Sequence, residues 1–255
     1  MYTMDGRIRY SECDENGTLS LLAMLNYLQD SSIFHAEDLF HGVSDISGRG
    51  LAWLIAAWQI RIERLPRFCD RISVSTWVHS MSKTLSSRNF VMADENGTPL
   101  VQADSLWFVF DAALGRPVRI PDDQRIYLTG DKPLDLPPTQ RRLSVTGAFD
   151  PAPEVTVGKL HLDTNNHVNN AQYLGMATDA IAACLGDQDA RRAEDIESIF
   201  IQYKQQARLG DVISPLVQIQ GHIRTVDLQS PDGDSYAIVR IGLRGEQDRV
   251  PVERS

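Results

Sequence analysis

Apolar residues recur at helical spacing in two segments of the chain, one in each half. The first stripe consists of Leu21, Leu22, Leu25 and Leu28. The second consists of Tyr173, Leu174, Ala177, Ala180, Ile181 and Cys184. Both stripes are typical of a helix that buries one face. Asn169 and Asn170 precede the second stripe, and their short amides can cap the N–H groups at a helix start.

Segments rich in β-forming residues follow each predicted helix. They span residues 72–79, 85–93 and 100–111 in the first half, and 212–223 and 236–243 in the second. Residues 94–97 read Asp-Glu-Asn-Gly, a hairpin turn signal, and residues 230–234 are also rich in turn-forming residues. Each half is therefore expected to be one long helix followed by antiparallel strands, since a sheet that buries one face against a helix is stable.

The two halves also repeat a polar segment directly before the helix. Residues 14–20 read Asp-Glu-Asn-Gly-Thr-Leu-Ser, and residues 163–169, which lie 149 positions later (163 − 14), read Asp-Thr-Asn-Asn-His-Val-Asn. A strand-turn-strand pattern after each helix aligns on Asp70 and Asp211, 141 positions apart (211 − 70). The first copy thus has about eight more residues between its helix and this pattern, which loops tolerate. Two matches in the same order predict a tandem repeat.

Between the halves, residues 117–153 are rich in Pro, Asp and Arg and weak in apolar periodicity, as expected for a surface linker. We predict an N-terminal domain over residues 1–130, a linker over residues 131–152 and a C-terminal domain over residues 153–255.

The composition is that of a globular protein, with 255 residues, 42% of them hydrophobic and 23% charged. The net charge of −9 argues against a nucleic-acid partner. The chain lacks an apolar run of about 18 residues, which argues against a membrane partner, and its start lacks the order of a signal peptide. The cysteines, Cys13, Cys69 and Cys184, lie far apart and outside metal-ligand spacing. We expect a cytoplasmic protein with reduced thiols that uses no metal and no cofactor.

Asp163, Asn165 and His167 form an Asp-x-Asn-x-His motif. The motif stands directly before the second predicted helix. With the motif in this place, the chain resembles the acyl-acyl-carrier-protein (acyl-ACP) thioesterases of bacteria and plant plastids over nearly its whole length. The resemblance implies an α+β protein of two tandem hotdog domains, each a long central helix wrapped by a curved antiparallel sheet. It implies a thiolester hydrolase that releases free fatty acid from fatty acyl-ACP and ends chain elongation. The catalytic copy would be the second, since the first has Thr18 in place of His167.

Thioester hydrolysis needs an activated water or a nucleophile, and a group that stabilises the oxyanion. Asp163 is the candidate to activate water or to attack directly, Asn165 can orient water or the carbonyl, and His167 can act as general acid or base. The helix start after Asn169 offers backbone N–H groups as an oxyanion site. We assign substrate binding to Asn169, Asn170 and Tyr203.

The segment after the second helix departs from the family pattern. Members commonly have a tyrosine, two mostly basic residues and then a glutamate that is proposed to take part in catalysis. Here the segment that begins at Tyr203 reads Tyr-Lys-Gln-Gln, so Gln206 stands at the glutamate position. A glutamine can orient a water but cannot take a proton at neutral pH. We include Gln206 with the three motif residues in the predicted catalytic set.

The expected partner is an acyl carrier protein that carries a fatty acyl chain. Because such carriers are acidic, this acidic chain would need a local basic face, and the candidates are the arginines within residues 61–71 and Arg191-Arg192. The protein would act as a monomer whose halves form an internal pseudo-dimer, or as a homodimer.

Three other functions remain as alternatives. A hotdog hydratase is disfavoured, because the related motif resembles Asp-x-Asn-Pro-x-His with five positions from Asp to His, whereas here the step is four (167 − 163) and proline is absent. Gln206 keeps open a non-catalytic module that binds acyl thioesters. An acyl-CoA thioesterase is the third alternative.

Overall fold

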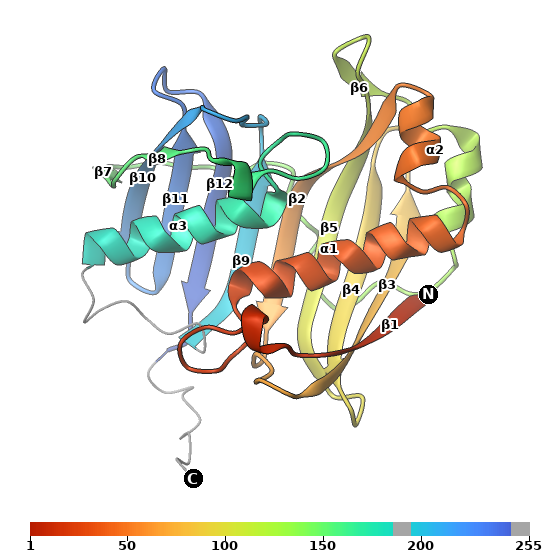
Figure 1. Ribbon diagram of the computed structural model, residues 1–255, viewed down its shortest axis with the longest axis horizontal. Helices are drawn as coiled ribbons and strands as arrows, with labels where there is room; N and C mark the ends of the chain where they lie inside the picture. The colour runs from red at the N-terminus through yellow and green to blue at the C-terminus, as the bar shows by residue number, and fades with distance from the viewer. Residues whose placement is uncertain (186–194, 246–255) are drawn as a thin grey trace. The chain divides into compact units, whose positions relative to one another are not determined.

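The computed structural model describes residues 1–185 and 195–245 (Figure 1). The chain forms two compact units, Met1–Leu143 (unit 1) and Ser144–Ser255 (unit 2). The division falls inside the predicted linker. In the described ranges, no helix is both long and apolar enough to cross a membrane.

Unit 1 is an antiparallel sheet crossed on one face by a long helix (Figure 1). Its helical elements are η1 (Tyr10–Glu12), α1 (Leu21–Asp38), α2 (Val43–Gly48) and η2 (Asp122–Tyr127). Its strands are β1 (Tyr2–Arg7), β2 (Leu51–Ile62), β3 (Arg71–Met81), β4 (Ser86–Asp94), β5 (Pro99–Asp111) and β6 (Arg116–Val118). The strand order is β1-β3-β4-β5-β2, and β6 pairs with β5.

The helix α1 follows the predicted stripe with one exchange. Ser20 caps its start, because the Ser20 Oγ accepts the N–H of Ala23 at 3.2 Å. Leu22 is half-buried and Met24 is fully buried, so Met24 belongs to the core instead of Leu22. The predicted positions that are buried are Leu21, Leu25 and Leu28.

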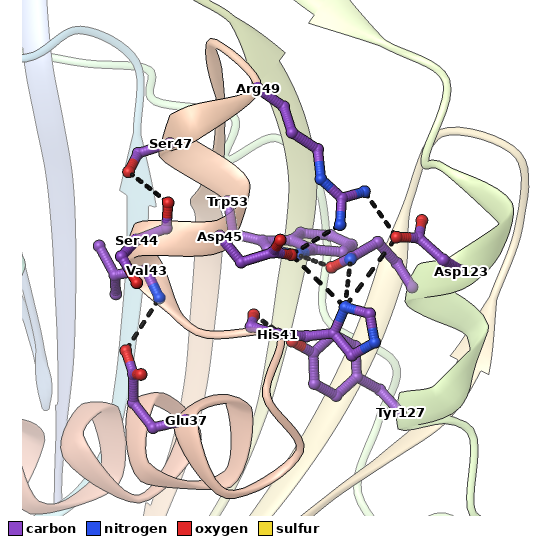
Figure 2. Close-up of polar contacts among 11 residues, drawn as sticks. Glu37, His41, Val43, Ser44, Asp45, Ser47, Arg49, Trp53, Asp123 and Tyr127 are labelled. Carbon is purple, nitrogen blue, oxygen red and sulfur yellow. Dashed lines mark hydrogen bonds and ion pairs between the residues drawn. The ribbon is translucent and has the colours of Figure 1, made fainter.

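The helix α2 lies in the segment where the first copy has its extra residues. Arg49, at the end of α2, contacts Asp45 at 2.7 Å and Asp123 of η2 at 2.5 Å (Figure 2). The indole N–H of Trp53 on β2 donates to Gln124 Oε1 at 2.9 Å. These contacts join α2 and β2 to η2, so the insertion is an integral part of unit 1.

A buried carboxylate fixes the segment that ends unit 1. Asp104 on β5 is 5% exposed; it accepts hydrogen bonds from Asn89 Nδ2 (2.9 Å) and Thr139 Oγ1 (2.6 Å), and lies 3.0 Å from His79 Nε2. Asn89 Oδ1 in turn accepts the N–H of Leu134 at 2.9 Å. The Asp104 cluster therefore holds residues 134–139 against β4 and β5.

Unit 2 repeats the plan of unit 1. Its elements are β7 (Asp150–Pro151), β8 (Val155–Thr156), η3 (Lys159–His161), α3 (Asn170–Leu185), β9 (Ile196–Tyr203), β10 (Val212–Gln220), β11 (Ile223–Gln229) and β12 (Ser235–Leu243). The strand order is β9-β12-β11-β10-β7, β8 also pairs with β10, and all of these pairings are antiparallel. The α+β fold of two helix-and-sheet units is thus confirmed.

Two details of unit 2 correct the sequence interpretation. The predicted strand 212–223 ends at Gln220, and Gly221, with φ of 57°, begins a turn into β11, which the prediction missed. On α3, Cys184 is exposed and Ile181 half-buried, so the last part of the predicted stripe was wrong. Tyr173, Leu174, Ala177 and Ala180 are buried as predicted.

The Asp104 cluster leads to a prediction about stability. Asp104→Ala removes the carboxylate acceptor of the buried Asn89 amide, which keeps only the Ala103 carbonyl at 3.5 Å, and releases Thr139. We expect the free energy of unfolding in urea to fall by about 2–4 kcal/mol, and proteolysis within residues 131–143 to accelerate. Asp122→Ala, which removes an exposed carboxylate, should change the free energy of unfolding by less than about 0.5 kcal/mol. Equal losses in both variants would contradict the anchoring role of Asp104.

Candidate active site

The Asp-x-Asn-x-His motif forms a tight loop between η3 and α3. The Asp163 N–H donates to the His167 carbonyl at 2.8 Å, and the Asn166 N–H donates to the Asp163 carbonyl at 3.1 Å. Asn166 has φ of 59°, a left-handed conformation that asparagine adopts more readily than most residues. The loop therefore closes on itself and presents its side chains from a fixed backbone.

The carboxylate of Asp163 stabilises the loop that carries it. Its Oδ1 accepts the backbone N–H groups of Asn165 (2.8 Å) and His167 (3.2 Å), the pattern of an Asx turn. Its Oδ2 lies 3.5 Å from Asn165 Nδ2. The structure thus brings Asp163, Asn165 and His167 together, with one carboxylate oxygen committed to the backbone.

Unit 1 contains the same loop without the histidine. Asp14 Oδ1 accepts the N–H groups of Asn16 and Thr18, both at 2.9 Å, and Gly17 has φ of 72° where unit 2 has Asn166. Thr18 is 1% exposed, whereas His167 is half-buried. The two loops therefore share their backbone and differ in the side chain at the fifth position.

A backbone hydrogen bond joins the loop to the segment after β9. The N–H of the buried Val168 donates to the Ala207 carbonyl at 2.9 Å. Gln206 precedes Ala207 and His167 precedes Val168, so both predicted residues lie next to this bond. The Gln206 side chain is exposed. Neither it nor the imidazole of His167 hydrogen-bonds to another residue in the described ranges. Both side chains are therefore available to a substrate or a water.

Two tyrosines, the buried Tyr173 and the half-buried Tyr203, support the loop and the helix that follows it. The hydroxyl of Tyr203 donates to the Asn170 carbonyl at 3.1 Å, and the N–H of Ala207 donates to the hydroxyl oxygen of Tyr173 at 2.9 Å. Burial raises the pKa of Tyr173 to about 12 and that of Tyr203 well above its usual value, so both phenols stay protonated. In this structure the Tyr203 hydroxyl is used to position α3.

The start of α3 uses its own N–H groups. Asn169 Oδ1 accepts the N–H of Ala171 at 2.9 Å, which confirms the predicted cap. The Gln172 N–H donates to the Asn169 carbonyl, and the Asn169 N–H donates to the His161 carbonyl, each at 2.9 Å. These three N–H groups are occupied, so they are not free to bind an oxyanion.

Two family models match the chain in order. The acyl-ACP thioesterase N-terminal domain matches residues 1–127, and the acyl-ACP thioesterase C-terminal domain, which includes the motif loop, matches residues 152–240. The chain belongs to the acyl-ACP thioesterase family.

Relatives in this family include plant proteins. The acyl-[acyl-carrier-protein] hydrolase FATB2 of Cuphea viscosissima is 24% identical over 246 residues, which cover 90% of this chain and 55% of that protein. The oleoyl-acyl carrier protein thioesterase 1 of Arabidopsis thaliana is 24% identical over 265 residues, with 95% and 72% covered. The chain spans about half the length of the Cuphea relative.

Solved structures of acyl-ACP thioesterases share the fold. An acyl-ACP thioesterase from Bacteroides thetaiotaomicron superposes with a TM-score of 0.85 at 20% identity, covering 95% of this chain and 97% of that one. The 12:0-ACP thioesterase from Umbellularia californica gives a TM-score of 0.78 at 21% identity, with 95% and 96% covered. The tandem hotdog architecture expected from the sequence is thus confirmed.

Sequence reasoning assigned no role to His161, which also shapes the site of this acyl-ACP thioesterase family member. His161 Nδ1 accepts the N–H of Gly158 at 3.0 Å, so the ring proton of this tautomer lies on Nε2. Glu12 takes the corresponding place in unit 1, where its Oε2 accepts the N–H of Arg9 at 2.8 Å. The signal for this role was its position 149 residues after Glu12 (161 − 12). Across residues 1–185 and 195–245, no group of three His, Cys, Asp or Glu side chains is suited to hold a metal ion.

Substitutions of the two tyrosines test whether their hydroxyls support the loop or contact the substrate. Tyr203→Phe removes one hydrogen bond to a helix carbonyl and should lower the free energy of unfolding by about 1 kcal/mol, with KM for acyl thioesters unchanged. Tyr173→Phe leaves the buried N–H of Ala207 unpaired and should cost more, about 1–3 kcal/mol. Urea denaturation and steady-state kinetics measure both. A raised KM in Tyr203→Phe at unchanged stability would assign that hydroxyl to substrate instead.

Proposed function

We propose that this chain hydrolyses the thioester of fatty acyl-ACP and releases the free fatty acid. One observation carries the proposal: both units build the same loop, and the copy in the C-terminal domain presents an imidazole, His167, where the other copy buries Thr18. The family membership supports the same reaction, since the relatives named above are acyl-ACP hydrolases or thioesterases.

In the proposed reaction, water adds to the thioester carbonyl and the tetrahedral intermediate expels the thiol of the carrier. Asp163 Oδ1 is held by two N–H groups, so Oδ2 is the oxygen that accepts the proton of the water. The Asn165 amide, which donates to Oδ2 at 3.5 Å, lies beside this oxygen and can donate its second N–H to the oxyanion. The proton that Asp163 takes from the water passes to His167, which delivers it to the departing thiolate, and Gln206 orients the water. The products are a fatty acid and the free carrier thiol.

The first test separates the charge of Asp163 from its role in the loop. Asp163→Asn keeps an oxygen that can accept the two N–H groups but removes the base, so kcat should fall at least about 100-fold while the melting temperature changes little. Asp14→Asn makes the identical change in the loop of unit 1 and should leave kcat unaltered. Release of thiol from acyl-ACP, acyl-CoA and small acyl thioesters measures the rate.

His167→Thr completes the test, because it gives unit 2 the fifth residue of the unit 1 loop. Full activity in both Asp163→Asn and His167→Thr would refute the proposed site. Acyl-ACP binding by the wild type without thiol release would favour the non-catalytic module, and water addition to an enoyl thioester would favour the hydratase. Faster release from acyl-CoA than from acyl-ACP would favour the acyl-CoA thioesterase.

The arginines predicted to meet the carrier are partly neutralised. Arg61 pairs with Glu63 and Arg64 with Asp94, each at 3.2 Å, and Arg191-Arg192 lies outside the described residues. A different basic surface borders the motif loop. We define the loop rim as Lys159, Leu160, Arg208 and Leu209, whose two segments are joined because Val157 exchanges backbone hydrogen bonds with Asp211 and Gly210.

The loop rim has the character of a carrier-docking surface. Leu160 is 93% exposed and Leu209 54% exposed, although both are large apolar side chains. Lys159 and Arg208 form no ion pair within the described parts of the chain, despite its net charge of −9. A mixed apolar and basic surface suits an acidic partner that must deliver its thioester to the neighbouring loop.

Reversal of charge on the loop rim should impair the carrier substrate selectively. Lys159→Glu combined with Arg208→Glu should raise KM for acyl-ACP at least about tenfold, while small acyl thioesters keep their KM and kcat. Arg61→Glu combined with Arg64→Glu is the matched control with the same change in charge, and its KM should stay near that of the wild type. Equal effects on both substrate types, or a larger effect in the control, would exclude docking at the rim.

A further inference from the structure

The interior of unit 1 contains a buried arginine that the proposed reaction does not use. Arg88 on β4 is 6% exposed, and Phe90 and Met92, which share its face of the strand, are fully buried. Burial lowers the pKa of Arg88 to about 10, which leaves the guanidinium charged at neutral pH. Unit 1 thus holds a cation in its core.

The side chains around this cation are neutral. Arg88 Nη1 contacts His35 Nδ1 on α1 at 3.0 Å and donates to Thr76 Oγ1 on β3 at 3.2 Å, and its Cζ lies 5.6 Å from the ring centre of Tyr127. Burial, together with the charge of Arg88, lowers the pKa of His35 to about 4, so this imidazole is uncharged and accepts the hydrogen bond. The Tyr127 hydroxyl donates to the His41 carbonyl at 3.0 Å (Figure 2).

A buried charge without a counter-ion is costly. Removal of an ion from water costs several kcal/mol, and a hydrophobic residue of similar size is often as stable or more stable in such a place. Arg49 in the same unit contrasts with Arg88, since it is 38% exposed and contacts two carboxylates, Asp45 and Asp123. Within the described ranges, Arg88 has no carboxylate partner. Stability of unit 1 alone therefore gives no reason for a cation here.

The arrangement leaves one edge of the guanidinium open. Both hydrogen bonds of Arg88 use Nη1, and no described residue bonds to Nε or Nη2. Neither nitrogen is among the polar atoms that are sealed from solvent without a partner. These two N–H groups point in parallel and match the two oxygens of a carboxylate.

Neighbouring rings hold the imidazole that contacts Arg88 in place. The imidazole of His35 stacks on Tyr2 at 5.4 Å between ring centres and meets the edge of Tyr127 at 5.7 Å. Residues of α1, β3 and η2 thus contact the guanidinium of Arg88 on β4, and Tyr2 of β1 supports the α1 residue. Binding to such a preformed group costs little side-chain entropy.

We propose that the Nε and Nη2 edge of Arg88 binds the carboxylate of a monocarboxylate ligand inside unit 1. The carboxylate supplies the missing negative charge, and His35, Thr76 and Tyr127 hold the arginine ready for it. The ligand is either a small free carboxylate or the end of a fatty acid. The site does not depend on the proposed hydrolysis, which uses the loop of unit 2.

Ligand-induced thermal stabilisation and calorimetric titration test the site with three probes: acetate, octanoate and octanol at matched ionic strength. We expect octanoate or acetate to bind the wild type and raise its melting temperature, and octanol at the same concentration to do so at least about tenfold more weakly. Arg88→Met should abolish the difference between octanoate and octanol. Arg88→Lys, which keeps the charge but lacks the fork, should weaken carboxylate binding at least about tenfold.

Arg224→Met is the matched control. Val226 on β11 pairs with Val217 on β10, as Phe90 on β4 pairs with Thr76 on β3. Arg224 and Arg88 each stand two residues before the first member of these pairs, so they occupy equivalent positions in the two units. Arg224 is also buried, at 8% exposed, and the carboxylate response of the variant should equal that of the wild type. Acetate binding would identify a small carboxylate as sufficient, and octanoate binding alone would identify a fatty acid. Equal binding of octanol and octanoate by the wild type, or unchanged carboxylate binding in Arg88→Met, would overturn the proposal.

Discussion

The hydrogen bond from the Val168 N–H to the Ala207 carbonyl holds the motif loop against the segment that follows β9. Val168 is buried, and its neighbour His167 is half-buried. Gln206, the neighbour of Ala207, is exposed. In unit 1 the equivalent bond runs from the Leu19 N–H to the Pro66 carbonyl at 2.8 Å. The frame of the site is thus a property of the repeat, and its chemistry depends on the residues placed on that frame.

Much of this frame could be predicted from the sequence, because the residues that mark it recur at matching positions in the two halves. The alignment of Asp70 with Asp211 is matched by equivalent bonds: the Ile8 N–H donates to the Asp70 carbonyl at 3.0 Å, and the Val157 N–H donates to the Asp211 carbonyl at 2.9 Å. The aspartate that closes each motif loop, and the glycine or asparagine with positive φ inside it, are local requirements. Local requirements leave a pattern in a single sequence.

Other features left no such pattern, because they depend on which polar residues tertiary packing buries. The strand β11 was missed since Thr225 and Asp227 are polar yet buried, which removes the alternation that marks a half-exposed strand. Arg88 is indistinguishable from a surface arginine until β4 is placed under α1. The use of the Asn169 N–H by His161 depends on contacts that close only in the folded unit. The burial of polar residues and their hydrogen-bond partners therefore cannot be predicted from the sequence pattern.

The geometry also explains how the proposed catalytic side chain can reside in a loop that must fold stably. In both copies the loop is closed by the aspartate Oδ1 and by backbone groups, and the side chain of the fifth residue contributes no described hydrogen bond to the unit 2 loop. Replacement of this side chain therefore costs little folding free energy in unit 2. In unit 1 the residue at the same position, Thr18, is buried at 1% exposure. A titratable imidazole requires access to solvent and substrate, so unit 2 can accommodate it at this position. The aspartate has the opposite constraint, because it must keep the loop closed with one oxygen while, in the proposed reaction, the other meets the substrate.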